Sequence, residues 1–296
     1  MAGAQRFLVG LIGSDLGPSL SPPLHEREAD HLGVRYLYQR IDLDVLGLRA
    51  EDVGDLVAQA HRFGFAGLNI THPSKQAVVK YLDELSPEAA ALGAVNTVVL
   101  RDRRAVGHNT DRSGFVAGFR RGLPAARVRD VALLGAGGAG AAVAFALAQL
   151  GTRRLTVVDV VLEQAERLAA AVERSALPPD DVPVAVEVAH SVEDVRDRFA
   201  AADGVVNATP VGMGPGRDMP LPADLLRPSQ WVADIIYRPL ETELLRQARR
   251  IGCRTLHGGG MVVAQAADAF RLITGLAPDA ERMHGHFAAL TAAAAT

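Results

Sequence analysis

The stretch "VALLGAGGAG", residues 131–140, decides the fold class of this chain. Four apolar residues are followed at once by Gly135, Gly137 and Gly140, and an Ala-rich segment begins there. Glycines in G-x-G-x-x-G spacing between a strand and a helix permit a tight turn, a close backbone approach to a pyrophosphate and close helix–strand packing. The stretch therefore predicts a dinucleotide-binding βα unit, with a Gly/Ala turn that only packs tightly as the alternative.

The next predicted strand supplies an independent test. "LTVVDV", residues 155–160, contains Asp159 close to the spacing of about 20 residues at which an acidic side chain binds the adenosine ribose. A carboxylate accepts the ribose hydroxyls but repels a 2′-phosphate, and no Arg or Lys follows until Arg167. We therefore predict NAD rather than NADP. In the alternative interpretation Asp159 only caps the next helix, and Arg153 or Arg154 approaches from the other end of the strand.

The rest of the chain alternates short runs of Val, Ile and Leu with longer segments of helical period, which indicates an α/β fold with parallel sheets covered by helices. The predicted strands are residues 7–12, 35–42, 65–70, 97–101, 131–134, 155–158, 184–188, 204–207 and 231–236. The predicted helices are residues 22–31, 51–63, 73–82, 140–150, 162–175, 261–274 and 278–291. We expect domains at 1–112 and 113–255, with C-terminal helices at 256–296 that return to the first domain.

Composition narrows the class of partner. The 296 residues are 49% hydrophobic, and Lys+Arg (31) nearly cancels Asp+Glu (34), which favours a small-molecule ligand over nucleic acid. Cys253 is the single cysteine, so no intrachain disulfide can form and a reducing, cytoplasmic compartment is expected. The sequence has no Cys/His spacing typical of a zinc site, so we predict no metal. It also has no apolar run long enough to span a membrane, so we predict no membrane partner. The oligomeric state stays open, with a homodimer as one candidate.

A second polar stretch is "GLNITHPSKQ", residues 67–76. Pro73 suits the first turn of a helix, so the strand should end by Thr71 and Lys75 should lie in that first turn. The helix dipole and partial burial would both favour the neutral amine, which can act as a base. A solvated surface lysine is the alternative on position alone.

Two further stretches lie in the same predicted domain. "GAVNTVV" (93–99) contains Asn96, and "GHNTDRSGF" (107–115) contains Asn109, Thr110 and Asp111. Each could be an ordinary turn residue. Together with a lysine base, they supply a carboxylate and neutral hydroxyl-binding groups, as oxidation of one hydroxyl on a polyhydroxylated ring requires.

The sequence resembles the shikimate dehydrogenase family, and most closely its NAD-dependent quinate/shikimate dehydrogenase branch. The resemblance covers nearly the whole chain through ordered motifs: "SLSPPLHE", "GLNITHPSKQ", "LGAVNTVV", "GHNTD", "GAGGAG", "VVNATPVGM", "DIIYRPLETELL" and "GGGMVVAQAADAF". It implies an N-terminal α/β substrate-binding domain, a Rossmann-type domain for NAD, and an active site in the cleft between them.

The resemblance also implies residue roles. Lys75 and Asp111 are the proton-transfer pair: Lys75 takes the hydroxyl proton, and Asp111 holds Lys75 in register while favouring its charged form. The implied substrate-binding residues, with the serines on the carboxylate, are Ser19, Ser21, Asn69, Thr71, Asn96, Tyr237 and Gln265. The implied cofactor-binding residues are Gly135, Ala136, Gly137, Gly138, Ala139, Asp159, Asn207, Thr209, Pro210, Val211, Met213, Gly260 and Met261.

Departures from the family pattern leave the substrate open. Many NADP-using relatives carry an Asn-Arg-Thr-like stretch where this chain has Val158, Asp159 and Val160, which again supports NAD. Glu26 follows His25 where many members have Asn. Shikimate, quinate, and aminoshikimate or aminoquinate, which an acid such as Glu26 would favour, are the candidate substrates. A non-catalytic NAD(H) sensor is the alternative from another class, although Lys75 and Asp111 are both retained.

Overall fold

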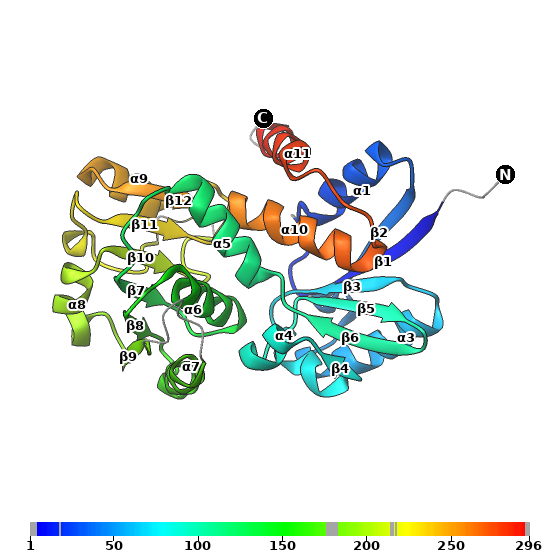
Figure 1. Ribbon diagram of the computed structural model, residues 1–296, viewed down its shortest axis with the longest axis horizontal. Coiled ribbons are helices and arrows are strands. Elements are labelled where there is room, and N and C mark those ends of the chain that lie inside the picture. The colour runs from blue at the N-terminus through cyan, green and yellow to red at the C-terminus, as the bar shows by residue number, and fades with distance from the viewer. Residues whose placement is uncertain (1–4, 18, 176–182, 214–215, 217, 294–296) are drawn as a thin grey trace. The chain divides into compact units, whose positions relative to one another are not determined.

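The computed structural model describes residues 5–17, 19–175, 183–213, 216 and 218–293, and the chain divides into two compact units (Figure 1). Unit 1 comprises Met1–Thr110 and Val263–Thr296, and unit 2 comprises Asp111–Val262. The sequence places the second join earlier, after residue 255. The difference arises because β12 (Arg254–His257) pairs with a strand of unit 2 and so belongs to that sheet.

Unit 1 contains a six-stranded mixed sheet in the order β2-β1-β3-β5-β6-β4. Its strands are β1 (Arg6–Gly13), β2 (Arg35–Asp42), β3 (Gly67–Ile70), β4 (Glu84–Leu85), β5 (Thr97–Arg101) and β6 (Arg104–His108). β1 is parallel to β2 and β3, but β5 is antiparallel to both of its neighbours, which corrects the expected parallel sheet. The two-residue hairpin at Asp102 and Arg103, whose φ angles of 51° and 62° fit a type I′ turn, makes β5 and β6 antiparallel.

Helices cover both faces of the unit 1 sheet. They are α1 (Ser21–His31), α2 (Leu43–Leu46), α3 (Val53–Arg62), α4 (Pro87–Leu92), α10 (Gly259–Thr274) and α11 (Ala280–Ala293), with 3-10 helices η1 (Ala50–Asp52) and η2 (Ala77–Tyr81). Leu68 and Ile70 pack into the core that includes α3. Because side chains alternate along a strand, Asn69 points to the other face, where the core of α1 and α10 lies.

The helix predicted at 73–82 is wrong. The chain turns through residues 71–76 and forms only the short η2. The backbone N–H of Ser74 bonds to Thr71 O, and Lys75 O accepts from Val95 N at 2.9 Å. Lys75 is therefore held by the segment before β5, and the expected effect of a helix N-terminus on this lysine has no structural basis.

Unit 2 contains a six-stranded, fully parallel sheet in the order β12-β11-β10-β7-β8-β9. Besides β12, its strands are β7 (Asp130–Leu134), β8 (Arg154–Val158), β9 (Ala185–Ala189), β10 (Gly204–Asn207) and β11 (Trp231–Asp234). Strand order reverses between β7 and β10, as in the doubly wound dinucleotide fold. The predicted Rossmann-type sheet is confirmed.

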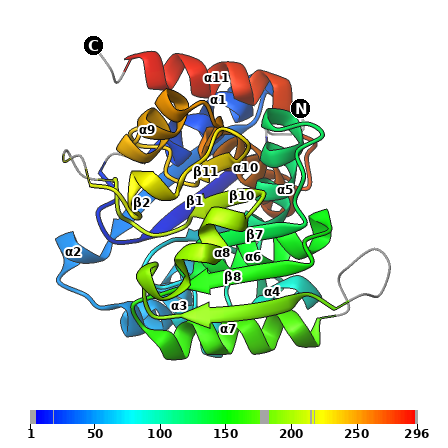
Figure 2. The same ribbon diagram turned by 90° about the vertical axis from the view of Figure 1, so that its left-hand side faces the viewer.

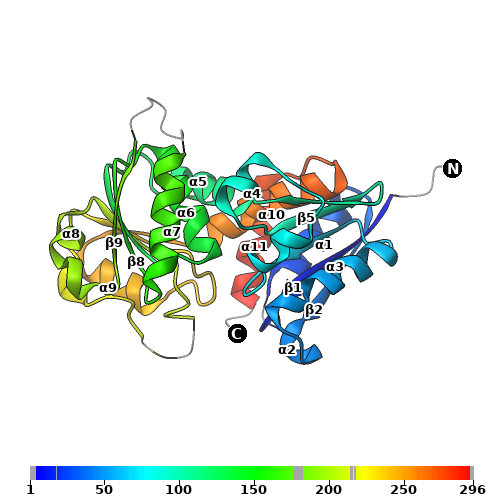
Figure 3. The same ribbon diagram turned by 90° about the horizontal axis from the view of Figure 1, so that it is seen from below.

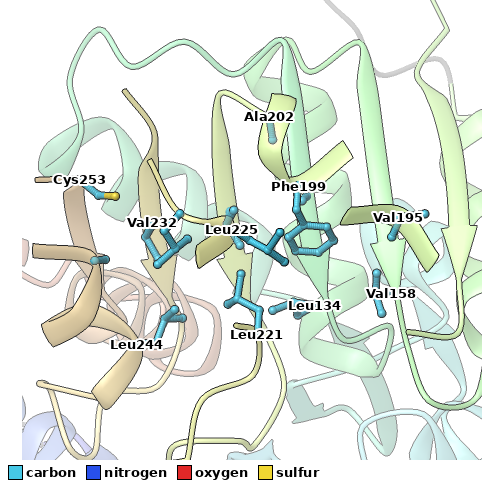
Figure 4. Packing of buried hydrophobic residues seen from close by; sticks show 14 of the residues in the cluster. Leu134, Val158, Val195, Phe199, Ala202, Leu221, Leu225, Val232, Leu244 and Cys253 are labelled. Atoms are coloured by element: carbon cyan, nitrogen blue, oxygen red, sulfur yellow. The ribbon is translucent and has the colours of Figure 1, made fainter. Parts of the chain in front are cut away.

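Helices cover both faces of this second sheet (Figures 2 and 3). They are α5 (Asp111–Gly122), α6 (Gly138–Leu150), α7 (Leu162–Arg174), α8 (Arg196–Ala201) and α9 (Glu243–Ile251), with η3 (Glu193–Val195) and η4 (Ala223–Leu225). On the α8/α9 face, Phe199 and Leu225 lie over Leu134 and Val232 in one apolar core (Figure 4). This packing fixes the carboxyl ends of the strands, where ligands bind in such folds.

Several elements were not expected from the sequence: α2, α4, β4, β6, β12, α5, α8 and α9. β4 has two residues and β12 is half-exposed, so neither leaves a strong apolar run. α9 is rich in Arg and Glu, and its buried side chains are only Leu244, Leu245 and Ala248. Among the described residues, no helix combines the length and apolar character that crossing a membrane requires.

Candidate active site

The Gly-rich turn between β7 and α6 has the geometry of a phosphate site. Gly135 has φ +97°, and a Cβ there would lie 2.9 Å from the Ala208 carbonyl. A Cβ on Gly140 would lie 2.1 Å from Gly135 O, so only glycine fits at either position. Gly137, at the N-cap of α6, faces open space and has no side chain to occupy the helix amides. Those amides fit an anionic pyrophosphate.

Asp159 follows β8 and is bonded to that same turn. Its Oδ2 accepts from Ala136 N at 2.7 Å, and its Oδ1 accepts from Val161 N at 2.8 Å. The carboxylate is partly exposed, and each oxygen keeps a lone pair for a ribose hydroxyl. Arg167 donates to Glu163 at 2.5 Å, and Arg154 pairs with Asp130 at the opposite end of β8. The ribose role of Asp159 stays a prediction, and this arrangement is compatible with it.

The loop after β10 contains the residues expected on the nicotinamide side. Asn207 is fully buried: its Oδ1 accepts from Thr209 N at 3.0 Å and Thr209 Oγ1 at 2.6 Å, and its Nδ2 donates to Val211 O at 3.1 Å. Asn207 thus shapes the loop from within. Val211 and Met213 are 37% and 55% exposed, so the loop presents apolar surface that a cofactor ring could contact.

Asp234 anchors this loop to the next strand. It is 1% exposed, and its carboxylate accepts from Asn207 Nδ2 at 3.1 Å, Ile236 N at 3.1 Å and Thr242 Oγ1 at 2.8 Å. Burial raises the pKa of Asp234 to about 6, against the opposing effect of these hydrogen bonds. A titrating carboxyl therefore supports the loop that Asn207 shapes.

Gly260 and Met261 begin α10 and pack on α5. A Cβ on Gly118 would lie 2.9 Å from Met261 N, so glycine permits this close approach. Met261 lines a cavity of about 10 Å³ together with Phe115, Phe119 and Leu256. Tyr237 follows β11 and is partly exposed.

In unit 1 the buried amide of Asn69 has three hydrogen-bond partners. Its Nδ2 donates to Asn96 O at 3.3 Å and to Thr97 Oγ1 at 3.1 Å. Its Oδ1 accepts from the Tyr38 hydroxyl at 2.5 Å. These bonds join β2, β3 and β5 on the face that α1 and α10 cover.

The same hydrogen-bond network continues to the C-terminal end of β6. Asn96 Oδ1 accepts from Thr97 Oγ1 at 3.0 Å and from Thr110 N at 2.8 Å, and Asn96 Nδ2 donates to Thr110 Oγ1 at 2.9 Å. Gln265 of α10 lies at its end, with Oε1 3.5 Å from Thr110 Oγ1. The structure therefore brings Asn69, Asn96 and Gln265, three of the predicted substrate residues, into one connected network.

Ser19 and Ser21 lie together at the start of α1, since Ser19 Oγ accepts from Ser21 N at 3.3 Å. Arg40, exposed at the end of β2, donates to Ser19 O at 2.9 Å. A guanidinium beside two serine hydroxyls favours a carboxylate ligand. Sequence reasoning assigned the carboxylate to the serines alone.

The predicted catalytic residues fall in different units. Lys75 lies after the turn that follows β3, partly exposed, and its backbone is bonded next to Asn96. Thr71 is in the same turn and is also partly exposed. Asp111 is buried in the first turn of α5 in unit 2. Lys75 thus follows the stretch that contains Asn69 and Thr71, and Asp111 follows Asn109 and Thr110 directly.

Sequence reasoning missed Tyr38, Thr97, Asp234 and Arg40. Asp234 had a signal, because an acidic residue at the carboxyl end of a predicted buried strand needs partners. Tyr38 alternates with exposed residues on β2 and reads as ordinary core. Its polar role depends on Asn69 of β3, which lies beyond β1 in the order of the sheet.

Comparisons with known proteins agree with this geometry. The family model described as "Shikimate dehydrogenase substrate binding domain" matches residues 11–98. The chain is 56% identical over 298 residues to "Shikimate dehydrogenase (NADP(+))" of Streptomyces avermitilis, covering 98% of each chain. The chain belongs to the shikimate dehydrogenase family. The predicted resemblance is thus confirmed, and the family model lies within unit 1.

Other members of the shikimate dehydrogenase family are named with NAD instead of NADP. "Quinate/shikimate dehydrogenase (NAD(+))" of Corynebacterium efficiens is 46% identical over 289 residues, 97% of this chain and 99% of the relative. Quinate dehydrogenase from Corynebacterium glutamicum in complex with NAD is a solved structure with a TM-score of 0.84, 46% identity, and coverage of 96% of this chain and 99% of that one.

Proposed function

We propose that this chain catalyses the NAD-dependent, reversible oxidation of a ring hydroxyl of shikimate, quinate or both to the 3-dehydro ketone. The observation that carries the cofactor assignment is Asp159, whose carboxylate is bonded to the phosphate turn through Ala136 N. A carboxylate at this place accepts both ribose hydroxyls and repels a 2′-phosphate. Arg167, the first cation after it, is bonded to Glu163.

The residues of unit 2 fit a nicotinamide dinucleotide. The turn formed by Gly135, Ala136, Gly137, Gly138 and Ala139 would hold the pyrophosphate. Thr209, Pro210, Val211 and Met213, in the loop that Asn207 shapes, would contact the nicotinamide side, with Gly260 and Met261. The bound cofactor supplies an acceptor for the hydride that leaves the substrate carbon.

The residues of unit 1 fit a carboxylated polyol. Ser19 and Ser21, with Arg40 beside them, would hold the carboxylate. Asn69, Asn96 and Gln265, which share one network, would hold ring hydroxyls together with Thr71. Tyr237, which belongs to unit 2, keeps the substrate role that the family resemblance implies. Several fixed polar contacts of this kind orient one ring carbon toward the cofactor.

Lys75 and Asp111 would transfer the proton. As the C–H hydrogen leaves as hydride, the hydroxyl proton passes to the Lys75 amine and the carbon becomes a carbonyl. Asp111 would position the amine and the hydroxyl. The Val95 N to Lys75 O bond supports this assignment, because it fixes the lysine backbone next to Asn96.

The test is a set of four initial rates with purified protein: NAD or NADP, each with shikimate or quinate. NAD is expected to give the higher kcat/KM with at least one acid. Preference for NADP would overturn the proposed role of Asp159. This outcome is a serious alternative because the Streptomyces avermitilis relative is named as an NADP-dependent enzyme.

Two other results would redirect the assignment. Turnover of aminoshikimate or aminoquinate, with neither hydroxy acid used, would move the substrate to the amino analogues. NAD binding by calorimetry without turnover of any of these acids would indicate a sensor.

A further inference from the structure

Asn69 is held in one orientation. Two of its partners, Asn96 O at 3.3 Å and Thr97 Oγ1 at 3.1 Å, take its two amide hydrogens. Since a backbone carbonyl can only accept, the Asn69 NH₂ group must face Asn96 and the amide cannot flip. The Tyr38 hydroxyl then meets Oδ1 as a donor, at 2.5 Å.

This orientation limits what Asn69 can offer a ligand. Both amide hydrogens have partners, and one lone pair of Oδ1 receives Tyr38. Within the described part of the chain, the second Oδ1 lone pair is what this side chain has left for a ligand. Asn69 can therefore accept a hydrogen bond from a ligand but cannot donate one.

One series of hydrogen bonds leads beyond Asn69 through Thr97 and Asn96 to Thr110, and Thr110 N and Oγ1 also donate back to Asn96 Oδ1. Thr97 Oγ1 donates to Asn96 Oδ1 at 3.0 Å, and Asn96 Nδ2 donates to Thr110 Oγ1 at 2.9 Å. Along this series each group donates to the next, and hydrogen bonds aligned in this way polarise one another. The Tyr38 hydroxyl donates into this network at Asn69 Oδ1.

Tyr38 is itself rigidly held. It is 7% exposed, the His25 ring is stacked on it with centroids 5.0 Å apart, and its backbone N–H donates to Glu26 Oε1 at 3.0 Å. A donor fixed by packing holds its acceptor better than a mobile one, because less rotamer entropy is lost.

We propose that Tyr38 is a positioning residue for substrate recognition: its hydroxyl fixes Asn69 as an acceptor that selects a substrate group able to donate a hydrogen bond. A ring hydroxyl or amine meets this requirement, whereas a carboxylate or ketone oxygen does not. The inference rests on the proposed function, from which the substrate role of Asn69 comes.

The experiment compares Tyr38→Phe with Tyr36→Phe. Tyr36 is the matched control because it lies on the same strand, is equally buried, and shares a hydrogen bond of 3.1 Å with His25 Nδ1 within the same aromatic cluster. Each variant removes one buried hydroxyl and keeps the ring. Only Tyr38 is bonded to Asn69.

For Tyr38→Phe we expect the KM of the acid substrate to rise about tenfold, with kcat within about threefold of wild type and the Kd of NAD unchanged. Tyr36→Phe should lower the melting temperature comparably but leave this KM within about twofold. Equal KM increases in both variants, or none in Tyr38→Phe, would overturn the proposal.

A second readout does not depend on turnover. The side-chain amide protons of Asn69, followed by NMR, should exchange slowly in wild type and in Tyr36→Phe, and faster in Tyr38→Phe. Unchanged exchange in Tyr38→Phe would refute the positioning role. If wild type oxidises none of the acids, the proposed function fails, while this NMR comparison still tests whether Tyr38 holds Asn69.

Discussion

Each unit contains a network of buried polar residues that links neighbouring elements, but the two networks differ in charge. In unit 1, Tyr38, Asn69 and Thr97 are neutral, and the Asn96 carbonyl fixes the orientation of the Asn69 amide. In unit 2, Asn207 and Thr242 converge on the carboxylate of Asp234. A network of neutral groups keeps its geometry when pH changes. In unit 2, by contrast, the hydrogen bonds that hold the loop after β10 depend on the protonation state of the buried carboxyl.

The buried titratable groups of the two units also respond to pH in opposite ways. His25, beside Tyr38, is fully buried, and burial lowers its pKa to about 3. Burial raises the pKa of Asp234 to about 6. Between these values acid weakens unit 1 through His25 and strengthens unit 2 through Asp234.

The largest expected effect is a loss of kcat without a change in NAD binding. Lys75→Ala should lower kcat about 10³-fold, because a positioned base contributes this much to proton transfer, while NAD binding to unit 2 stays unchanged. Stopped-flow turnover and NAD titration measure the two quantities. Lys80→Ala is the control, since Lys80 is exposed and lies 4.9 Å from the Tyr81 ring. Near-normal kcat in Lys75→Ala would remove this lysine from the mechanism.

The next effect concerns His25. Its folded-state pKa lies below the ordinary 6.5, so the stability that it contributes is present above pH 6.5 and lost as pH falls toward 3. Unit 1 should lose about 3 kcal/mol from this group between pH 7 and pH 4. Hydrogen exchange of β1–β3 peptides measures this loss. His25→Asn should flatten the slope, and an unchanged slope would show that other groups cause it.

Asp234 should produce the reverse slope in unit 2. Its folded-state pKa lies above the ordinary 3.8, so the stability that it contributes is present below about pH 4 and lost as pH rises through 6. The loss is about 3 kcal/mol at most. Trp231, the single tryptophan, is buried in unit 2, so its fluorescence follows the unfolding of this unit. Asp234→Asn keeps the shape and should remove the slope; a slope equal to wild type would contradict the assignment.

The smallest effect tests the exposed carboxylate of unit 2. Asp159→Asn should weaken NAD binding about tenfold. It should also reduce the preference for NAD over NADP, because the amide no longer repels a 2′-phosphate. Calorimetry with both cofactors measures it. Glu163→Gln, four residues on, should leave NAD affinity within about twofold. If both variants bind NAD like wild type, Asp159 has only a structural role in the turn.

Local sequence was sufficient for the nucleotide-binding βαβ segment of unit 2, but not for α5, α8, α9 and β12 of that unit or for parts of unit 1. The glycine spacing and Asp159 lie in consecutive segments, so the βαβ unit could be read directly, and the structure confirms it. The helix at 73–82 failed because bonds from Val95 and Thr71 hold the chain around Lys75 in turns, and helical propensity does not report such bonds. The parallel sheet of unit 1 failed at Asp102 and Arg103, which lack the glycine typical of a type I′ hairpin turn.

The sequence by itself determined the α/β class, the family and the phosphate turn, because each depends on residue types at short, fixed spacings. Only the tertiary structure decided that Tyr38 meets Asn69, 31 residues away, and that Asp234 meets both Asn207 and Thr242. Alternation along a strand tells which face a side chain takes, but not which strand lies beside it. That choice follows from the order β2-β1-β3-β5 and β11-β10-β7, which long-range packing sets.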